Sequence, residues 1–179
     1  LVEDAGGGGS TVRGELQIRR VPFLAQPDYD RLLWASDINF VRGEDSLVRA
    51  LWAARPVVWQ LYPQDGRTHC AKLEPFLARY RAPAALPEPN LPGTDRALDA
   101  LATLHRCWNG CPDGSSAPSA LRSHVHGDTP EATGIARAWA DVESALAPLT
   151  AHAQHLSDAW AALPDLTERL ARFCREKLK

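Results

Sequence analysis

Residues 36–54 constrain the fold of this chain more than any other segment. Residues 36–41 (SDINFV) have the composition of a strand, and residues 46–54 carry apolar side chains at helical spacing. A short charged turn with a single glycine joins the two. The segment therefore predicts a strand that passes directly into a helix, which is the basic unit of an open α/β sheet.

The neighbouring segments repeat this alternation and predict an α/β core over residues 15–80. Strands are expected at 16–23, 37–41 and 56–62. Three helices are expected: one that begins at Pro27, one at 44–54 and one at 68–80. Strands that alternate with helices on short connections indicate a parallel sheet. Residues 1–14 contain the run GGGGS and are expected to form a flexible leader or linker.

The chain changes character after residue 80. Residues 81–95 contain four prolines and are expected to form an extended link. Helices are predicted at 95–108, 131–162 and 164–178, with a loose loop at 113–129. The apolar side chains of this helical section (96–179) should pack on the α/β core and on each other; they include Trp139, Leu146, Leu149, Leu156, Trp160, Leu163, Leu166, Leu170 and Phe173.

Charge and hydropathy argue against two classes of partner. The net charge is -2 and no long single-sign run is present, whereas nucleic-acid binding depends on clustered cations. No apolar run approaches the ~20 residues that a membrane helix needs. The chain begins with Leu1 and contains no methionine, so we expect a fragment of a longer, cytoplasmic protein.

The chain has four cysteines, Cys70, Cys107, Cys111 and Cys174. They could form two disulfides or a metal site. Cys107 and Cys111 do not have a usual zinc spacing, and cytoplasmic proteins rarely keep disulfides. Free, partly buried thiols are therefore expected.

Four histidines need consideration as metal ligands: His124, His126, His152 and His155. His124 and His126 alternate in the predicted loop, but no third ligand follows at a convincing spacing. His152 and His155 lie three residues apart on a predicted helix and are expected to be solvated. The sequence therefore predicts no metal site.

The turn after the central strand carries the strongest candidate site. A helix N-terminus binds phosphate through unpaired N–H groups and its partial positive charge. Arg42 could bind phosphate oxygens bidentately or pair with a neighbouring carboxylate, and Gly43 allows close backbone approach or merely closes the turn. Ser46 could cap the helix or bind phosphate. Glu44 and Asp45 could complement the helix terminus or face a sugar or a cationic acceptor.

Two further groups flank this turn. Phe23, Gln26 and Tyr29 could stack on a nucleobase and read its edge, although ring packing in the core is the alternative for the two aromatic residues. Tyr62 and Gln64 follow the next predicted strand. Because ligands bind at the carboxyl ends of parallel strands, these residues should share one sheet edge with Arg42. The sequence predicts a nucleotide diphosphate site there.

Several motifs resemble one enzyme family, the protein-arginine rhamnosyltransferases that modify bacterial elongation factor P (EarP). The resemblance extends from about Leu16 to the C-terminus. It is carried by PFLAQPDYDRLLW at 22–34, DINFVRGEDS at 37–46 and WQLYPQ at 59–64, with support from WN at 108–109 and from residues 165–173.

The resemblance implies a fold and a reaction. The family has two Rossmann-like lobes in the GT-B arrangement, and this chain resembles the C-terminal, donor-binding lobe. The N-terminal acceptor lobe, which carries the aspartates associated with the acceptor, is absent from the chain. The implied reaction is inverting transfer of rhamnose from dTDP-β-L-rhamnose to an arginine of elongation factor P, without a metal or other cofactor. We expect the chain alone to bind the donor and not to catalyse transfer.

Site residues follow from the same resemblance, position by position. The diphosphate and sugar are assigned to Arg42, Gly43, Glu44, Asp45, Ser46 and Tyr62, with Glu44 reaching the transfer site as the catalytic candidate. The thymine is assigned to Phe23, Gln26 and Tyr29. The chain departs from the family pattern at four positions: Tyr29, Leu47, Val57 and Gln60.

Two alternatives remain. The chain could belong to another GT-B nucleotide-sugar transferase or epimerase with a different base or sugar. It could also be a non-catalytic interaction module whose helical tail binds a partner. In that case the turn at Arg42 is purely structural.

Overall fold

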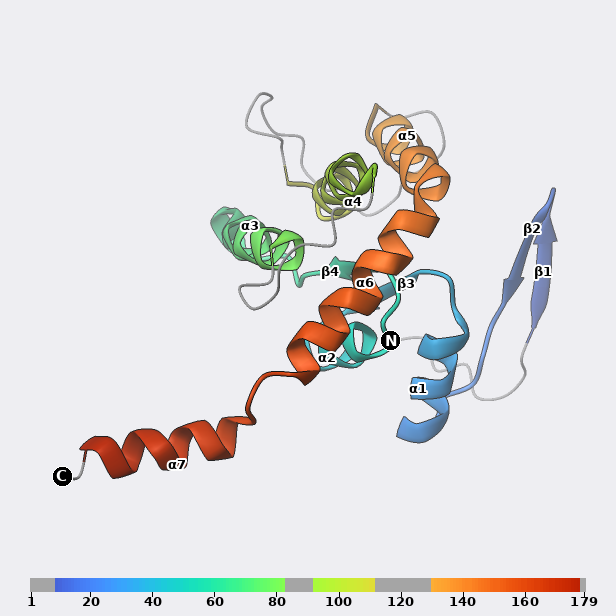
Figure 1. Ribbon diagram of the computed structural model, residues 1–179. Helices are drawn as coiled ribbons and strands as arrows, with labels where there is room; N and C mark the ends of the chain where they lie inside the picture. Colours follow the sequence, from blue (N-terminus) through green and yellow to red (C-terminus); the bar gives the residue numbers. More distant parts are fainter. Residues whose placement is uncertain (1–8, 83–91, 112–129, 178–179) are drawn as a thin grey trace.

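The structure, a computed structural model, describes residues 9–82, 92–111 and 130–177 (Figure 1). It is a mixed α/β arrangement dominated by helices. The strands are β1 (Ser10–Arg13), β2 (Leu16–Arg19), β3 (Asn39–Arg42) and β4 (Val57–Gln60). The helices are α1 (Gln26–Ala35), α2 (Glu44–Trp52), α3 (Thr68–Arg81), α4 (Thr94–Trp108), α5 (Pro130–Ser144), α6 (Leu146–Ala161) and α7 (Leu166–Lys177), with a 3-10 turn at Asp65–Arg67.

The centre of the fold is the predicted strand–helix–strand unit. β3 and β4 pair in parallel, with Asn39 opposite Val57 and Arg42 opposite Gln60. Helix α2 makes the crossover between them, and its Leu47 and Ala50 are buried. Val57 and Val58, which point to opposite faces of β4, are both fully buried, as expected of a strand covered on two sides. The α/β prediction is confirmed for this unit.

The predicted strand at 16–23 behaves differently from expectation. Residues of β2 pair antiparallel with β1 and not with the parallel pair. Gly14, at φ 60°, lies in the two-residue loop between them, a position that favours glycine. Residues 10–13, expected in a flexible leader, thus form one strand of a hairpin. Figure 1 shows this hairpin at one side of the molecule, and all eight of its strand residues are exposed.

The helix predicted at 131–162 is two helices, α5 and α6, that break at Ala145. Pro148 lies in the first turn of α6 and has no N–H to donate to the carbonyl of Ser144, four residues earlier. The Ser144 hydroxyl also donates to the carbonyl of Asp141 at 2.8 Å. Both features favour an end at Ser144 and a new start.

The packing predicted for the helical section holds for α5 and α6 but not for α7. Leu149 and Leu156 are fully buried, and Trp139 and Trp160 pack against the core. In contrast, Leu166, Leu170 and Phe173 of α7 are all more than half exposed. Figure 1 shows α7 extending away from the body. The expectation that the last helix packs on the core is wrong for this structure.

His152 also departs from expectation, because it is buried and not solvated. It points from α6 toward α3, where its Nε2 lies 2.8 Å from the carbonyl oxygen of Tyr80. His155 is half-buried. His124, His126, the predicted loop at 113–129 and most of the proline-rich link lie outside the described residues. None of the described helices is long and apolar enough to span a membrane.

Candidate functional site: the turn between β3 and α2

The turn is built around Gly43, which joins β3 to α2. Its backbone has φ 80° and ψ 173°, a conformation that is essentially restricted to glycine. The Gly43 N–H donates to the carbonyl of Gln60 at 3.4 Å, which extends the parallel ladder by one bond. The Gly43 carbonyl accepts from the Trp59 indole Nε1 at 3.0 Å and from the Leu47 N–H at 3.4 Å. These bonds fix where α2 begins.

Arg42 and Tyr62 lie together beside this turn. The Arg42 guanidinium carbon is 4.6 Å from the centre of the Tyr62 ring, a cation–π contact. A Cβ on Gly43 would meet the same ring at 3.4 Å. Both side chains are exposed, so their outer faces are open to a ligand. The prediction that the ends of β3 and β4 bring Arg42 and Tyr62 to one edge is confirmed.

The first turn of α2 presents free hydrogen-bond donors at the same edge. Among the described residues, the N–H groups of Glu44, Asp45 and Ser46 have no acceptor, and no side chain caps the helix. Ser46 therefore does not take the capping role. Three N–H groups at a helix N-terminus form a site for an anion.

The two carboxylates of this turn differ in their surroundings. The Asp45 carboxylate lies 3.5 Å from Arg49 Nε, one helical turn along α2. Arg49 is also held by Asp30 of α1 at 3.0 Å, and this hydrogen bond raises the pKa of the guanidinium. Glu44 is exposed and makes no ion pair within the described part of the chain. Arg42 likewise forms no ion pair with either carboxylate there, so its surface-pairing alternative is not what the structure shows.

The predicted nucleobase residues are separately placed. Phe23 is fully exposed before α1, and Gln26 is the exposed first residue of that helix. Tyr29, half-buried, packs against the core. The described structure does not bring these three side chains into one pocket, and their role stays a prediction.

Sequence comparison identifies the family. The family model described as "Elongation-Factor P (EF-P) rhamnosyltransferase EarP" matches residues 2–175. The chain belongs to this family.

The relatives and a solved structure agree. A protein-arginine rhamnosyltransferase of Pseudomonas aeruginosa is 40% identical over 164 residues, which cover 90% of this chain and 35% of that protein. The corresponding protein of Pseudomonas putida is 39% identical over 166 residues, covering 93% and 36%. A structure that describes the basis for EarP-mediated arginine glycosylation of translation elongation factor EF-P matches with a TM-score of 0.66 and 34% identity, over 98% of this chain and 46% of that one. The chain thus spans about a third of the length of these curated relatives.

In this EarP-family chain, two side chains at the C-terminal end of α4 hold the outer edge of β4: His105 in its last turn and Asn109, which directly follows it. From the sequence, Asn109 was quoted only as part of the family resemblance, and His105 was not singled out. His105 Nε2 accepts the Trp59 N–H at 3.1 Å, and Nδ1 lies 2.9 Å from the carbonyl of Leu101. Asn109 Oδ1 accepts the Leu61 N–H at 2.8 Å. Complete burial lowers the pKa of His105 to about 4, so the ring is neutral at pH 7.

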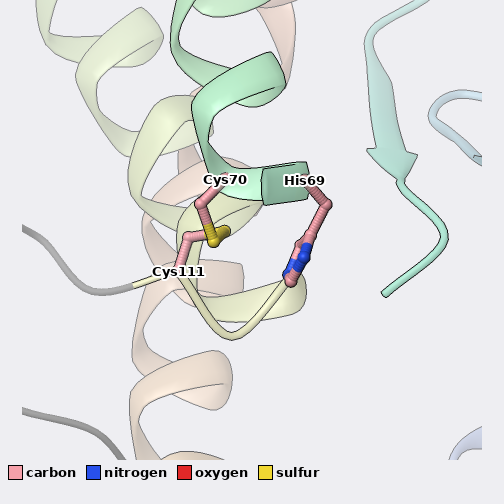
Figure 2. Close-up of side chains that lie close together, drawn as sticks. All are labelled: His69, Cys70 and Cys111. Carbon is pink, nitrogen blue, oxygen red and sulfur yellow. A yellow bond between two sulfur atoms is a disulfide. The ribbon is translucent and has the colours of Figure 1, made fainter. Parts of the chain in front are cut away.

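A disulfide joins Cys70 and Cys111 beside this edge, which corrects the expectation of four free thiols (Figure 2). Cys70 lies in the first turn of α3 and Cys111 follows α4. Because α3 and α4 pack together, residues 41 apart in sequence meet, and no local spacing reveals this. Cys107, half-buried, and Cys174, exposed, are not part of the disulfide, so for these two the predicted thiol form is confirmed.

His69 lies next to the disulfide, and one of its ring nitrogens and the two sulfurs are within 4.8 Å of one another. Both ring nitrogens are engaged: Nδ1 accepts the Gln64 N–H at 3.2 Å, and Nε2 lies 3.3 Å from the carbonyl of Asn109. The two sulfurs are bonded to each other. This donor set therefore fits a structural cross-link and not a metal ion.

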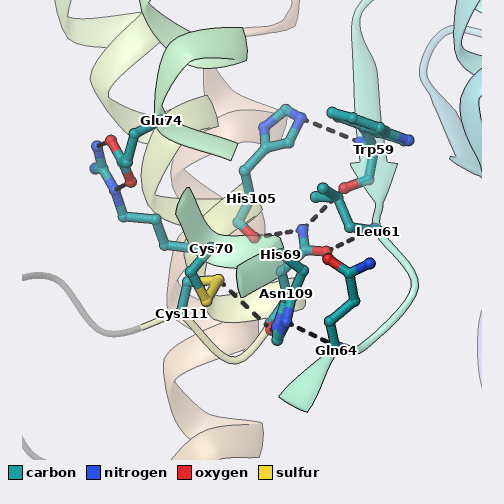
Figure 3. The surroundings of a disulfide bond; sticks show 10 residues. Trp59, Leu61, Gln64, His69, Cys70, Glu74, His105, Asn109 and Cys111 are labelled. Carbon is teal, nitrogen blue, oxygen red and sulfur yellow. Dashed lines mark hydrogen bonds and ion pairs between the residues drawn. A yellow bond between two sulfur atoms is a disulfide. The ribbon is translucent and has the colours of Figure 1, made fainter. Parts of the chain in front are cut away.

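A second link between α3 and α4 flanks the disulfide (Figure 3). Arg106 Nε and Nη2 donate to the two carboxylate oxygens of Glu74 at 2.8 and 2.9 Å. The hydrogen bond from Arg106 lowers the pKa of Glu74. Together the cross-link and the bidentate pair fix the end of α4, and with it the two side chains that hold β4.

Proposed function

We propose that this chain is the donor-binding part of a protein-arginine rhamnosyltransferase. It holds dTDP-β-L-rhamnose, and the whole enzyme transfers rhamnose to an arginine of elongation factor P in the cytoplasm. Family membership and the names of the relatives support the reaction. The geometry of the turn between β3 and α2 supports the donor role.

One observation carries the proposal: a cation, an aromatic ring and three free N–H groups converge at the carboxyl edge of two parallel strands. The guanidinium of Arg42 and the first turn of α2 supply positive charge and donors for a diphosphate. The ring of Tyr62 contacts the Arg42 guanidinium, and its hydroxyl is a further hydrogen-bond donor. Gly43 removes the Cβ that would separate backbone and ligand.

The surroundings of the two carboxylates assign them different roles. Asp45 is turned toward Arg49 along α2, which partly neutralises a carboxylate that would otherwise repel the diphosphate. Glu44 is free to reach toward the sugar and the incoming acceptor. An arginine acceptor is a poor nucleophile because its guanidinium stays protonated at neutral pH. A carboxylate near the transfer site can orient the guanidinium and accept the proton that its nitrogen releases, as the new C–N bond forms and dTDP leaves.

We assign the chain to the C-terminal lobe of a GT-B fold. The parallel β3–α2–β4 unit supports this assignment, as does coverage of less than half of the matched EarP structure. The acceptor-binding part lies in the remaining portion of that protein. Elongation factor P accordingly contacts mainly the portion not represented in this chain, and the chain alone binds donor without transferring rhamnose.

Calorimetric titration with dTDP-β-L-rhamnose and with UDP-glucose tests the proposal. Saturable binding of the dTDP-sugar, at least tenfold tighter than binding of UDP-glucose, is the expected result. Tighter binding of UDP-glucose would favour the other GT-B transferases or epimerases. Binding of neither sugar, by this chain and by the whole protein, would refute a donor site and leave the interaction module, for which the exposed apolar residues of α7 are the relevant observation.

A further inference from the structure

The outer edge of β4 is paired by side chains and not by a third strand. β3 occupies one edge of β4, and on the opposite edge the backbone groups of Trp59 and Leu61 are directed away from β3. Asn109 accepts the Leu61 N–H at 2.8 Å and donates from Nδ2 to the Trp59 carbonyl at 2.8 Å. One amide thus makes the two bonds that a neighbouring strand would make.

The Asn109 amide has a single allowed orientation. Its Nδ2 also donates to the carbonyl of His105 at 2.9 Å, so both of its protons and its oxygen are used. Only the oxygen can accept from the Leu61 N–H, and only the nitrogen can donate to the two carbonyls. The side chain is buried, and the Asn109 carbonyl is in turn contacted by His69 Nε2. Figure 3 shows these bonds converging on Asn109 next to the disulfide.

The hydrogen bond from the Leu61 N–H to Asn109 Oδ1 is the last bond that holds this strand before Tyr62. Leu61 directly precedes Tyr62, and the next residue, Pro63, has no N–H to pair. The path of the chain into Tyr62 is therefore set by the Leu61–Asn109 bond. The Tyr62 ring in turn lies beside Gly43 and makes the cation–π contact with the Arg42 guanidinium.

We propose that Asn109 is a positioning residue for the donor site: it holds the end of β4 so that Tyr62 places Arg42 against the diphosphate. The inference rests on the proposed function. Asn109 touches no ligand itself. Its effect on donor binding passes through Leu61 and Tyr62.

Two substitutions test this role against a matched control. Asn109→Ala removes all three side-chain bonds. Asn109→Asp keeps the acceptor but turns an oxygen toward the carbonyls of Trp59 and His105. His152→Ala is the control, because it removes a buried bond of 2.8 Å between α6 and α3, away from the donor turn. Each variant is first compared with the wild type by urea unfolding.

Titration with dTDP-β-L-rhamnose is then expected to show at least tenfold weaker binding for both Asn109 variants and less than a twofold change for His152→Ala. Equal affinities for Asn109→Ala and His152→Ala, at equal loss of stability, would overturn the inference. If Arg42→Ala loses donor binding in the same experiment, the proposed donor site still stands and only the role of Asn109 is refuted. Weakening in both Asn109 variants and Arg42→Ala would support both proposals.

Amide hydrogen exchange provides a readout that needs neither donor binding nor a folded variant. In the wild type, the protection factors of the Leu61 and Gly43 amides are expected to agree within threefold, because one opening of the β4 end exposes both. A protection factor for Gly43 more than tenfold lower than that for Leu61 would overturn the coupling. This result stands even if the chain binds no donor, so failure of the inference and failure of the proposed function remain distinguishable.

Discussion

Reduction of the Cys70–Cys111 disulfide should destabilise the chain substantially. The bond closes a loop with a sequence separation of 41 residues. In the chain-entropy model, removing a cross-link over a loop of that size costs about 4 kcal/mol, because the unfolded chain regains the freedom that the loop had removed. The Glu74–Arg106 pair and the packing of α3 on α4 remain, so the reduced chain is expected to stay folded but with a lower free energy of unfolding.

Urea unfolding followed by tryptophan fluorescence, with and without dithiothreitol, measures this loss. With a denaturant slope of ~2 kcal/mol per molar, the midpoint should fall by about 2 M on reduction. The chain offers a matched control in its other two cysteines. The double variant Cys107→Ser/Cys174→Ser should respond to reductant as the wild type does. The double variant Cys70→Ser/Cys111→Ser should unfold at a lower urea concentration, and its midpoint should not change on addition of reductant. An unchanged wild-type midpoint, or a shift in the variant that lacks Cys70 and Cys111, would refute the reasoning.

Three further predictions concern the turn and its support. Gly43→Ala should lower the free energy of unfolding by about 1–3 kcal/mol, because alanine does not favour φ 80° and its Cβ would contact Tyr62; unaltered urea stability would contradict this. Because the pKa of His105 is lowered to about 4, the unfolded chain binds the proton more readily, so stability should fall between pH 6.5 and 4 by up to roughly 3 kcal/mol. His105→Gln should show a shallower slope over that range, and an identical slope would disprove the assignment. In the whole enzyme, Glu44→Ala should reduce turnover more than donor affinity, whereas Asp45→Ala should weaken both; equal losses of turnover and affinity in Glu44→Ala would count against its role.

The strand–turn–helix at the centre of the fold was predictable because it is local. The apolar spacing of α2 and the single glycine at 43 mark the junction, and parallel pairing follows from the short crossover. The proximity of Arg42 and Tyr62 was also predictable, because neighbouring parallel strands end at the same edge of a sheet. The sequence thus predicted the centre of the candidate site from spacing alone.

The features that sequence reasoning missed depend on contacts between distant segments. The disulfide, the burial of His152 and the bonds from α4 to β4 all arise from how α3, α4 and α6 pack, and none leaves a periodic pattern. The break between α5 and α6 did have a local signal in Pro148, which the long apolar pattern masked. The exposure of α7 contradicts its amphipathic pattern, which predicts packing on a surface.

The most direct test of the account is the effect of Arg42→Ala on the affinity for dTDP-β-L-rhamnose, measured by calorimetric titration. Arg172→Ala is the control, because it removes an exposed arginine of α7 that pairs only with Glu168 among the described residues. Loss of a charge-assisted hydrogen-bonding group should weaken binding about 10- to 100-fold in Arg42→Ala and leave the control unchanged. Equal affinities for the wild type and Arg42→Ala would contradict the central claim that this turn binds the diphosphate of the donor.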